Sequence, residues 1–407
     1  MTKKLDALVI GGGQAGLAAR YELAQRGIDN ILLEKDSVAS KWRERWDSFT
    51  LVTPNWTVKL PGATYAGPEP DGFMPRDEIV AHLDRYASTP GGDIVTGVVA
   101  TEILESADGG FRVETSQGPF QARNVIVASG TFQEPKRPDV GTLAPSILEL
   151  HSSAYSKPEN LPDGAVLVIG SGQSGCQITE ELLESGRRVY MSTGRAGRAS
   201  RRYRGRDIFS WLETIGYFGQ PVESLPSPAA RMNANPHVSG KDGGRTLNLH
   251  RLASQGVSLL GHVTAFDGTR VQFADDRNAN LQGSDDFSTF IRAQIDEAIV
   301  AQGIDAPVSD PADDYTGTDG FDQPDARELD LAAEGIATVL WSAGYSYDFS
   351  WVKPATLDEA GYPVQRSDYS DNRGLYFLGM HFLHWRKSGI FYGVGDEASA
   401  IATHIAR

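Results

Sequence analysis

Two glycine-rich turns carry the clearest chemical signal in this sequence of 407 residues. The first turn holds Gly11, Gly13 and Gly16, between a short apolar run and a segment with helical spacing. In such a turn the first glycine permits the tight bend, the second lets the backbone approach a pyrophosphate, and the third lets the helix pack on the strand. Glu34 ends the next apolar run, where a carboxylate can accept hydrogen bonds from ribose hydroxyls. These four residues predict a site for the adenosine diphosphate half of a dinucleotide.

The second turn repeats this arrangement with Gly170, Gly172 and Gly175. Its following strand ends in Ser192 and Thr193, where the first unit has an acid. A carboxylate at that place would repel the 2′-phosphate of NADP, so its absence favours NADPH over NADH.

Arginines crowd the chain directly after this strand. Residues 187–206 contain eight arginines and no acidic residue, in a chain with a formal net charge of −15. Arginine binds phosphate through two parallel hydrogen bonds. We therefore predict Ser192, Thr193 and Arg195 at the 2′-phosphate, with Arg201 and Arg202 as alternatives, and we expect other arginines of the segment to pair with acidic groups.

The elements around each glycine turn form a β-α-β unit. In the first unit residues 5–10 and 31–34 are expected strands and 14–26 a helix; in the second, 165–169 and 188–191 are strands, with a helix ending near 184. One such unit repeated at a domain-sized interval predicts an α/β fold with two Rossmann-like dinucleotide-binding domains. We expect residues 1–158 and 336–407 to form the first domain and 159–335 the second.

An acidic insertion over residues 276–330 is expected within the second domain. Residues 287–300 have the pattern of an amphipathic helix, and residues 305–330 hold nine acidic residues and one arginine. Without clear periodicity, the latter stretch is expected to be a solvated loop.

Composition excludes several other classes of protein. The charge balance disfavours nucleic acid as a partner. The sequence contains no apolar run near the roughly 18 residues that a membrane helix needs, and the first strand lies too close to the start for a signal peptide, so we expect a cytoplasmic protein. Cys176 is the single cysteine, which excludes a Cys-x-x-Cys redox pair and a cysteine zinc site.

Together with the strand ends Ala-Ser-Gly130 and Ser-Ala-Gly344, these motifs resemble the flavin-containing monooxygenases, which are class B flavoprotein monooxygenases that use FAD and NADPH. Lys41 and Trp42 match the tryptophan-containing segment of that family, and Leu60-Pro61-Gly62 is similar to its plant indole-pyruvate branch. His151 and Tyr155 match the end of the family's Phe-x-Gly-x-x-x-His-x-x-x-Tyr/Phe motif. Pro145 and Ile147 stand where that motif has Phe and Gly.

The resemblance implies a glutathione-reductase-like fold, with each domain a three-layer ββα sandwich, and FAD and NADPH as cofactors. It also implies that NADPH reduces FAD and that dioxygen then forms a C4a-hydroperoxyflavin, which oxygenates a small N-, S- or carbonyl-containing substrate. Gly130, Gly344 and Gly379 would contact the cofactors, and a helix over residues 396–405 would point its N-terminus at the flavin. Asn55 is the candidate for the family's asparagine near the flavin edge, with a simple Asx turn as its alternative. His384 and Arg386 are candidates for the substrate pocket.

Other interpretations remain open at this point. The chain could be an NAD(P)H:acceptor reductase or oxidase of the same fold, or a non-catalytic NADPH-binding redox sensor. His381 and His384 have a spacing that suits a metal, but no third ligand is near them in the sequence, so no metal site is predicted. The oligomeric state stays open, with a homodimer as one possibility.

Overall fold

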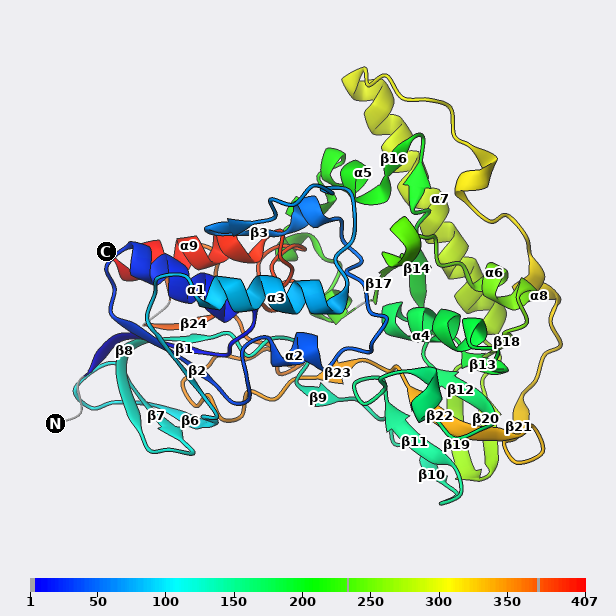
Figure 1. Cartoon of the computed structure of the whole chain (residues 1–407), viewed down its shortest axis with the longest axis horizontal. Helices are drawn as coiled ribbons and strands as arrows, with labels where there is room; N and C mark the ends of the chain where they lie inside the picture. Colours follow the sequence, from blue (N-terminus) through cyan, green and yellow to red (C-terminus); the bar gives the residue numbers. More distant parts are fainter. Residues whose placement is uncertain (1–3, 233, 372–373) are drawn as a thin grey trace.

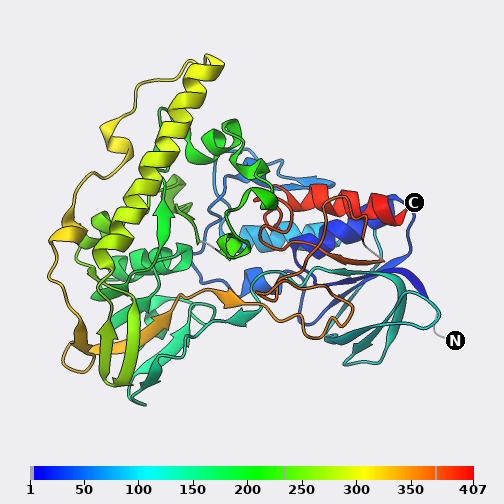
Figure 2. The same cartoon turned by 180° about the vertical axis from the view of Figure 1, so that it is seen from behind.

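The computed structural model describes residues 4–232, 234–371 and 374–407. It contains two α/β domains side by side, and the first strand and the last helix of the chain both belong to the first domain (Figure 1). The long helix α7 (Arg277–Gln302) rises from the second domain as an arm, which the opposite view also shows (Figure 2).

The first domain is built on a sheet whose central strands are parallel. Across this sheet the order is β5 (Asp93–Thr96), β2 (Asn30–Glu34), β1 (Leu5–Ile10), β8 (Phe120–Val127), β7 (Phe111–Thr115) and β6 (Ala100–Glu105), and β24 (Leu375–Phe377) pairs with the C-terminal half of β8. Side chains of β1 alternate between two cores, with Ala7 and Val9 in one and Leu8 and Ile10 in the other. This alternation shows a strand that is buried on both faces.

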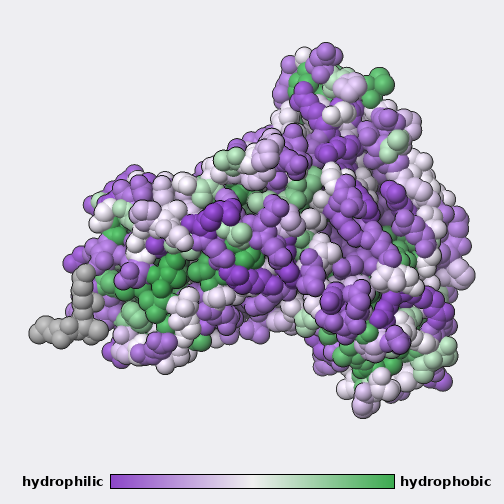
Figure 3. Space-filling view, viewed as in Figure 1, coloured by the Kyte–Doolittle hydropathy of each residue, from purple (hydrophilic) through white to green (hydrophobic). Residues whose placement is uncertain are grey.

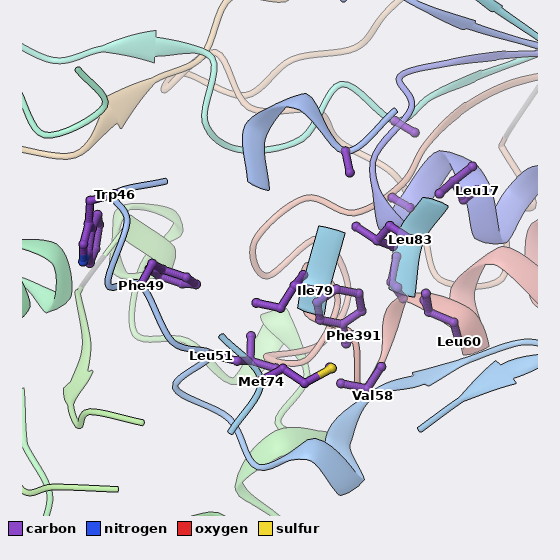
Figure 4. Close-up of a cluster of buried hydrophobic side chains, with 14 of the residues drawn as sticks. Leu17, Trp46, Phe49, Leu51, Val58, Leu60, Met74, Ile79, Leu83 and Phe391 are labelled. Atoms are coloured by element: carbon purple, nitrogen blue, oxygen red, sulfur yellow. The ribbon is translucent and has the colours of Figure 1, made fainter. Parts of the chain in front are cut away.

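Helices cover one face of this sheet. They are α1 (Gln14–Gln25), α2 (Ser40–Arg43), α3 (Arg76–Ala87) and α9 (Val394–Ile405). Figure 4 shows the apolar cluster that joins these helices to the following loops, with Leu17 of α1, Ile79 and Leu83 of α3, and Phe391 among its members. On the other face, Ile103, Phe111 and Val113 of the antiparallel strands cover the sheet.

The second domain repeats this three-layer design. Its sheet is parallel, in the order β11 (Leu148–His151), β22 (Ile336–Trp341), β12 (Ala165–Ile169), β13 (Val189–Ser192) and β18 (Ser258–Leu260). Helix α4 (Gln173–Glu184) packs on one face. The other face packs against a second sheet of β10 (Gly141–Leu143), β19 (Val263–Gly268), β20 (Arg270–Phe273) and β21 (Glu328–Asp330).

The remaining elements are short and lie mostly in the connecting loops. They are β3 (Lys59–Leu60) paired with β4 (Ala63–Thr64), β14 (Ala196–Arg198) with β17 (Ala234–His237), β15 (Arg202–Tyr203) with β16 (Arg206–Asp207), the helices α5 (Ile208–Thr214), α6 (Leu249–Ser254) and α8 (Asp319–Asp322), and 3-10 turns that include η1 (Asn55–Thr57), η3 (Tyr217–Gly219) and η4 (Val222–Ser224).

The two crossings between the domains lie next to each other. Strand β9 (Glu134–Pro135) pairs in antiparallel fashion with β23 (Tyr345–Ser346). The expected boundaries after residues 158 and 335 need correction, because β11 and β22 both belong to the second domain's parallel sheet. The chain therefore crosses near 134–135 and returns near 345–346.

The acidic insertion is more ordered than the sequence predicts. Helix α7 extends well beyond the expected 287–300, and part of the stretch expected as a solvated loop packs back on the domain. Asp314 is buried there in ion pairs with Arg198, at 2.6 Å, and Arg292, at 3.7 Å. Val300 near the end of α7 and Val308 in the chain after it are exposed, and Figure 3 shows apolar surface at this tip.

Candidate active site

The first glycine turn has two positions closed to any side chain and one that is open. A Cβ atom at Gly11, where φ is +116°, would lie 2.3 Å from the carbonyl oxygen of Ala128. A Cβ at Gly16 would lie 1.8 Å from the carbonyl oxygen of Gly11. A Cβ at Gly13 would meet nothing within 4 Å, although Gly13 caps the N-terminus of α1. This open space in front of a helix N-terminus is what a pyrophosphate needs.

Glu34 lies beside this turn at the end of β2. Its side chain is buried, and its two oxygens accept hydrogen bonds from the amides of Gly12, at 2.5 Å, and Asp36, at 2.9 Å. Each carboxylate oxygen has a second lone pair. The carboxylate is thus held rigidly, and it keeps lone pairs that suit the predicted contact with ribose hydroxyls.

The second glycine turn reproduces the geometry of the first. A Cβ at Gly170 would lie 2.5 Å from the carbonyl oxygen of Ser342, and a Cβ at Gly175 would lie 1.9 Å from that of Gly170. Gly172, which caps α4, has nothing within 4 Å. The structure therefore contains two cradles of the same shape, each made of a glycine turn and the helix N-terminus that follows it. The first cradle is residues 11–16 and the second is residues 170–175, and both fit a dinucleotide.

The predicted glycines at the strand ends gather around these cradles. Gly130 and Gly344 have positive φ angles and open space at Cβ, and they flank the paired linkers. Gly379 packs against α1, where a Cβ would lie 2.4 Å from that of Ala15. His151 hydrogen-bonds through Nε2 to the carbonyl oxygen of Gly344 at 3.1 Å, and burial lowers its pKa. A neutral His151 thus fixes the returning linker.

The side chains of Trp42 and Lys41 point to different places in the structure. The indole Nε1 of Trp42 donates to Oε1 of Gln14, at the start of α1, and its ring stacks on Phe391 with centroids 5.4 Å apart. Lys41 is directed to the surface, where its Nζ lies 2.7 Å from Oε2 of Glu44. The structure therefore brings Trp42 to the first cradle and corrects the prediction that Lys41 binds the cofactor.

Ser192 and Thr193 have a structural task in place of the predicted phosphate contact. Both are almost fully buried. The hydroxyl of Ser192 donates to the carbonyl oxygen of Gly261 at 3.0 Å, and that of Thr193 donates to the carbonyl oxygen of Leu260 at 2.7 Å. These bonds hold the ends of β13 and β18 together, so neither hydroxyl faces a phosphate.

Arg195 stands apart from the other arginines of its segment. It is exposed, and among the residues that the structure describes it has no hydrogen bond, ion pair or ring contact. The alternatives Arg201 and Arg202 both pair with Asp207. Arg198 pairs with Asp285 and Asp314 of the acidic insertion. Within the described part of the chain, Arg195 is therefore the free cation next to the second cradle.

Replacing Arg195 with alanine is expected to weaken binding of NADPH and to leave binding of NADH nearly unchanged. One charge-assisted hydrogen bond contributes about 1.5–3 kcal/mol, so the Michaelis constant for NADPH should rise about ten- to hundredfold. Initial rates of flavin reduction with each cofactor measure this. Equal losses with NADPH and NADH would mean that Arg195 has only a structural role.

Asn55 is occupied by its own loop. Its Nδ2 donates to the carbonyl oxygen of Glu69 at 3.0 Å, and its Oδ1 accepts the amide of Met74 at 2.8 Å. The side chain is buried with both ends used. This geometry corrects the prediction that Asn55 acts at the flavin edge, because its side-chain amide ties residues 69 and 74 to residue 55 within one loop.

His384 and Arg386 lie on the loop between β24 and α9 and differ in access. His384 is buried, and its Nδ1 lies 3.0 Å from Oε1 of Glu397 in the first turn of α9. Ser388 donates to the same oxygen. The predicted contact of His384 with substrate is therefore corrected to a role in fixing the loop. Arg386 is partly exposed and packs on the rings of Tyr217 and Phe382.

Sequence reasoning missed Gln14, Glu397 and Gln220. Gln14 lies inside the first glycine motif, so its position in the sequence could have indicated that it belongs to the site. Gln220 contacts Arg386 across a separation of 166 residues, which no local pattern encodes.

Among the described residues, no three His, Cys, Asp or Glu side chains are grouped to hold a metal ion. None of the described helices is both long and apolar enough to span a membrane.

A family model for pyridine nucleotide-disulphide oxidoreductases matches residues 8–214, just over half of the chain. The chain belongs to the pyridine nucleotide-disulphide oxidoreductase family. It is therefore an oxidoreductase, and the match covers the first cradle, the linker and the second cradle.

Known proteins that are similar to this chain include oxidoreductases and monooxygenases. An uncharacterized CzcO-like oxidoreductase of Geobacillus kaustophilus is 29% identical over 98% of both chains. Indole-3-pyruvate monooxygenase YUCCA1 of Oryza sativa is 33% identical over 46% of this chain and 47% of its own. The flavin-containing monooxygenase from Stenotrophomonas maltophilia has a TM-score of 0.65 at 20% identity, covering 100% of this chain and 98% of its own. These findings confirm the predicted fold class and the predicted flavin-containing monooxygenase resemblance.

Proposed function

We propose that this protein is an NADPH-dependent FAD monooxygenase that oxygenates a small N-, S- or carbonyl-containing substrate. The observation that carries the proposal is the pair of matched cradles, one beside Glu34 and one beside Arg195. An acid at the first suits the ribose of FAD, and a free arginine at the second suits the 2′-phosphate of NADPH. The plant and bacterial monooxygenases named above support the same activity.

The protein's own part in this reaction is to bind, orient and shield. Bound FAD supplies the chemistry, because it accepts a hydride from NADPH and then activates dioxygen. The open space at Gly13 and Gly172 admits the two pyrophosphates. Trp42 covers the start of α1 and shields it from solvent. The N-terminus of α9 offers a positive dipole end, which favours an anionic reduced ring.

A reductase that passes electrons to a disulfide fits this chain less well. Cys176 is the single cysteine of the sequence, and it is fully buried. Burial raises the pKa of its thiol, which donates weakly to the carbonyl oxygen of Ser171. Thiol exchange requires an accessible thiolate, so Cys176 cannot serve as a redox partner of the flavin. Reduction of a quinone or of dioxygen remains the competing activity.

Oxygen incorporation separates the two activities. The holoenzyme, NADPH and ¹⁸O₂ are incubated with a panel of amines, sulfides and ketones, and products are analysed by mass spectrometry together with hydrogen peroxide. A monooxygenase is expected to place one ¹⁸O atom in a product and to consume NADPH faster when that substrate is present. If all NADPH consumed appears as hydrogen peroxide with every compound, the proposal is replaced by an oxidase or reductase.

A further inference from the structure

The loop between β24 and α9 brings the two domains together. It begins at Gly379, which packs on α1, and it ends at Gly393, which precedes α9. The second domain covers its middle, because the amide of Val222 donates to the carbonyl oxygen of His384 at 2.8 Å and the amide of Arg386 donates to that of Gln220 at 2.9 Å. Figure 2 shows this loop next to the η3–η4 segment. Arg386 therefore lies where the two cofactor-binding domains meet.

The guanidinium of Arg386 is held in place by neutral groups. Its carbon lies 4.0 Å from the ring centre of Tyr217 and 4.5 Å from that of Phe382. Its Nε and Nη2 both donate to Oε1 of Gln220, at 3.1 and 2.9 Å. Among the described residues, no carboxylate lies within ion-pair distance of Arg386. The neighbouring Lys387 does have such a partner in Asp396, at 2.6 Å.

This arrangement differs from that of Arg198 and Arg201, and it is closer to that of Arg20 and Arg277, which are buried and donate to backbone carbonyl oxygens. Arg198 and Arg201 are more deeply buried, and each pairs with aspartate. Burial lowers the pKa of Arg386, because the guanidinium loses contact with water and no carboxylate of the described residues lies within ion-pair distance. His381 adds no second positive charge beside Arg386, because burial lowers its pKa to about 4. Gln220 engages one edge of the guanidinium, and Nη1 donates no hydrogen bond to any residue that the structure describes.

A guanidinium with one edge fixed and another edge free suits a planar carboxylate, which accepts two parallel hydrogen bonds. We propose that Arg386 binds a carboxylate of the substrate, so that the substrates are small organic acids that carry the oxidisable N, S or carbonyl group elsewhere. This inference rests on the proposed function. Gln220 is then a positioning residue, which orients the guanidinium and leaves its charge unneutralised.

Matched pairs of compounds test the inference, each pair consisting of an acid and its amide with the same reactive atom. (Phenylthio)acetate with (phenylthio)acetamide and 3-(methylthio)propionate with its amide are suitable pairs. The holoenzyme is titrated with each compound without NADPH, and the change in flavin absorbance gives the dissociation constant. Turnover with NADPH then gives kcat/KM for every compound that is oxygenated.

Wild-type enzyme is expected to prefer the acid, and Arg386→Gln is expected to weaken acid binding about ten- to hundredfold with little change for the amide. Gln220→Glu should produce the same loss, because the new carboxylate would neutralise the charge of Arg386 while the side chain keeps its size. Arg366→Gln is the matched control, since Arg366 is an exposed arginine that pairs with Asp368. This control should keep the wild-type ratio of acid to amide.

The two proposals fail in different ways. If acids bind no more tightly than their amides in every pair, or if both variants keep the wild-type ratio, Arg386 is only a clasp between the domains and the inference is overturned. A higher melting temperature of Gln220→Glu with an unchanged ratio would overturn it in the same way. Oxygenation of the amides would still support the monooxygenase. Tight acid binding without oxygenation of any compound would instead overturn the proposed function.

Discussion

A Gly13→Val variant is expected to fold and to purify without the yellow colour of flavin. The protein offers no atom within 4 Å of a Cβ at this position, and the φ angle of −84° is ordinary for valine. The added side chain therefore strains little in the protein itself. It fills the space through which the backbone would approach the pyrophosphate, so binding of FAD should be lost.

The ratio of absorbance at the flavin band to that of protein measures this loss, and circular dichroism checks the fold. Gly283→Val is the control, because Gly283 lies on α7, far along the chain from either turn, and also has nothing within 4 Å of its Cβ. The control should keep its flavin. Full flavin content in folded Gly13→Val would show that FAD does not use the first cradle.

A Gly172→Val variant should be yellow and yet unreactive with NADPH. Gly172 caps α4 as Gly13 caps α1, and its Cβ would also point into open space. Valine here should displace the pyrophosphate of NADPH from several charge-assisted hydrogen bonds at once. Each contributes about 1.5–3 kcal/mol, so anaerobic flavin reduction at low NADPH should slow at least about a hundredfold.

Stopped-flow reduction measures that rate, and dithionite serves as a reductant that needs no nucleotide site. Dithionite should reduce the flavin of Gly172→Val as it does in the wild type. Normal reduction by NADPH would disprove the assignment of the second cradle. Loss of flavin in this variant would also disprove it, since the two glycines would then serve one site.

The glycine positions could be predicted from the sequence because their cause is local and steric. Gly11 and Gly16 are separated by five positions, and the contact between them arises within one turn of chain. Glu34 is predictable for the same reason, since a parallel β-α-β unit must place the end of its second strand beside the turn. The same reasoning located Gly170, Gly172 and Gly175.

Residues whose role depends on distant parts of the chain could not be predicted in this way. The end of β13 does lie near the second cradle, but β18 decides where the hydroxyls of Ser192 and Thr193 point. The acidic insertion shows no periodicity, yet Asp314 is buried because Arg198, more than a hundred residues earlier, faces it. The predicted domain boundaries were wrong because β22 is a short apolar run, and such a run suits the parallel sheet of either domain.

The paired linkers have a consequence for the order in which the protein can fold during synthesis. The second domain is one continuous segment between β9 and β23, and a ribosome completes it while the first domain still lacks two elements. These are β24, which pairs with β8, and α9, which packs on α1. Domains generally fold as units as they emerge, so the earlier half of the first domain must wait, with an open sheet edge, for the last residues of the chain.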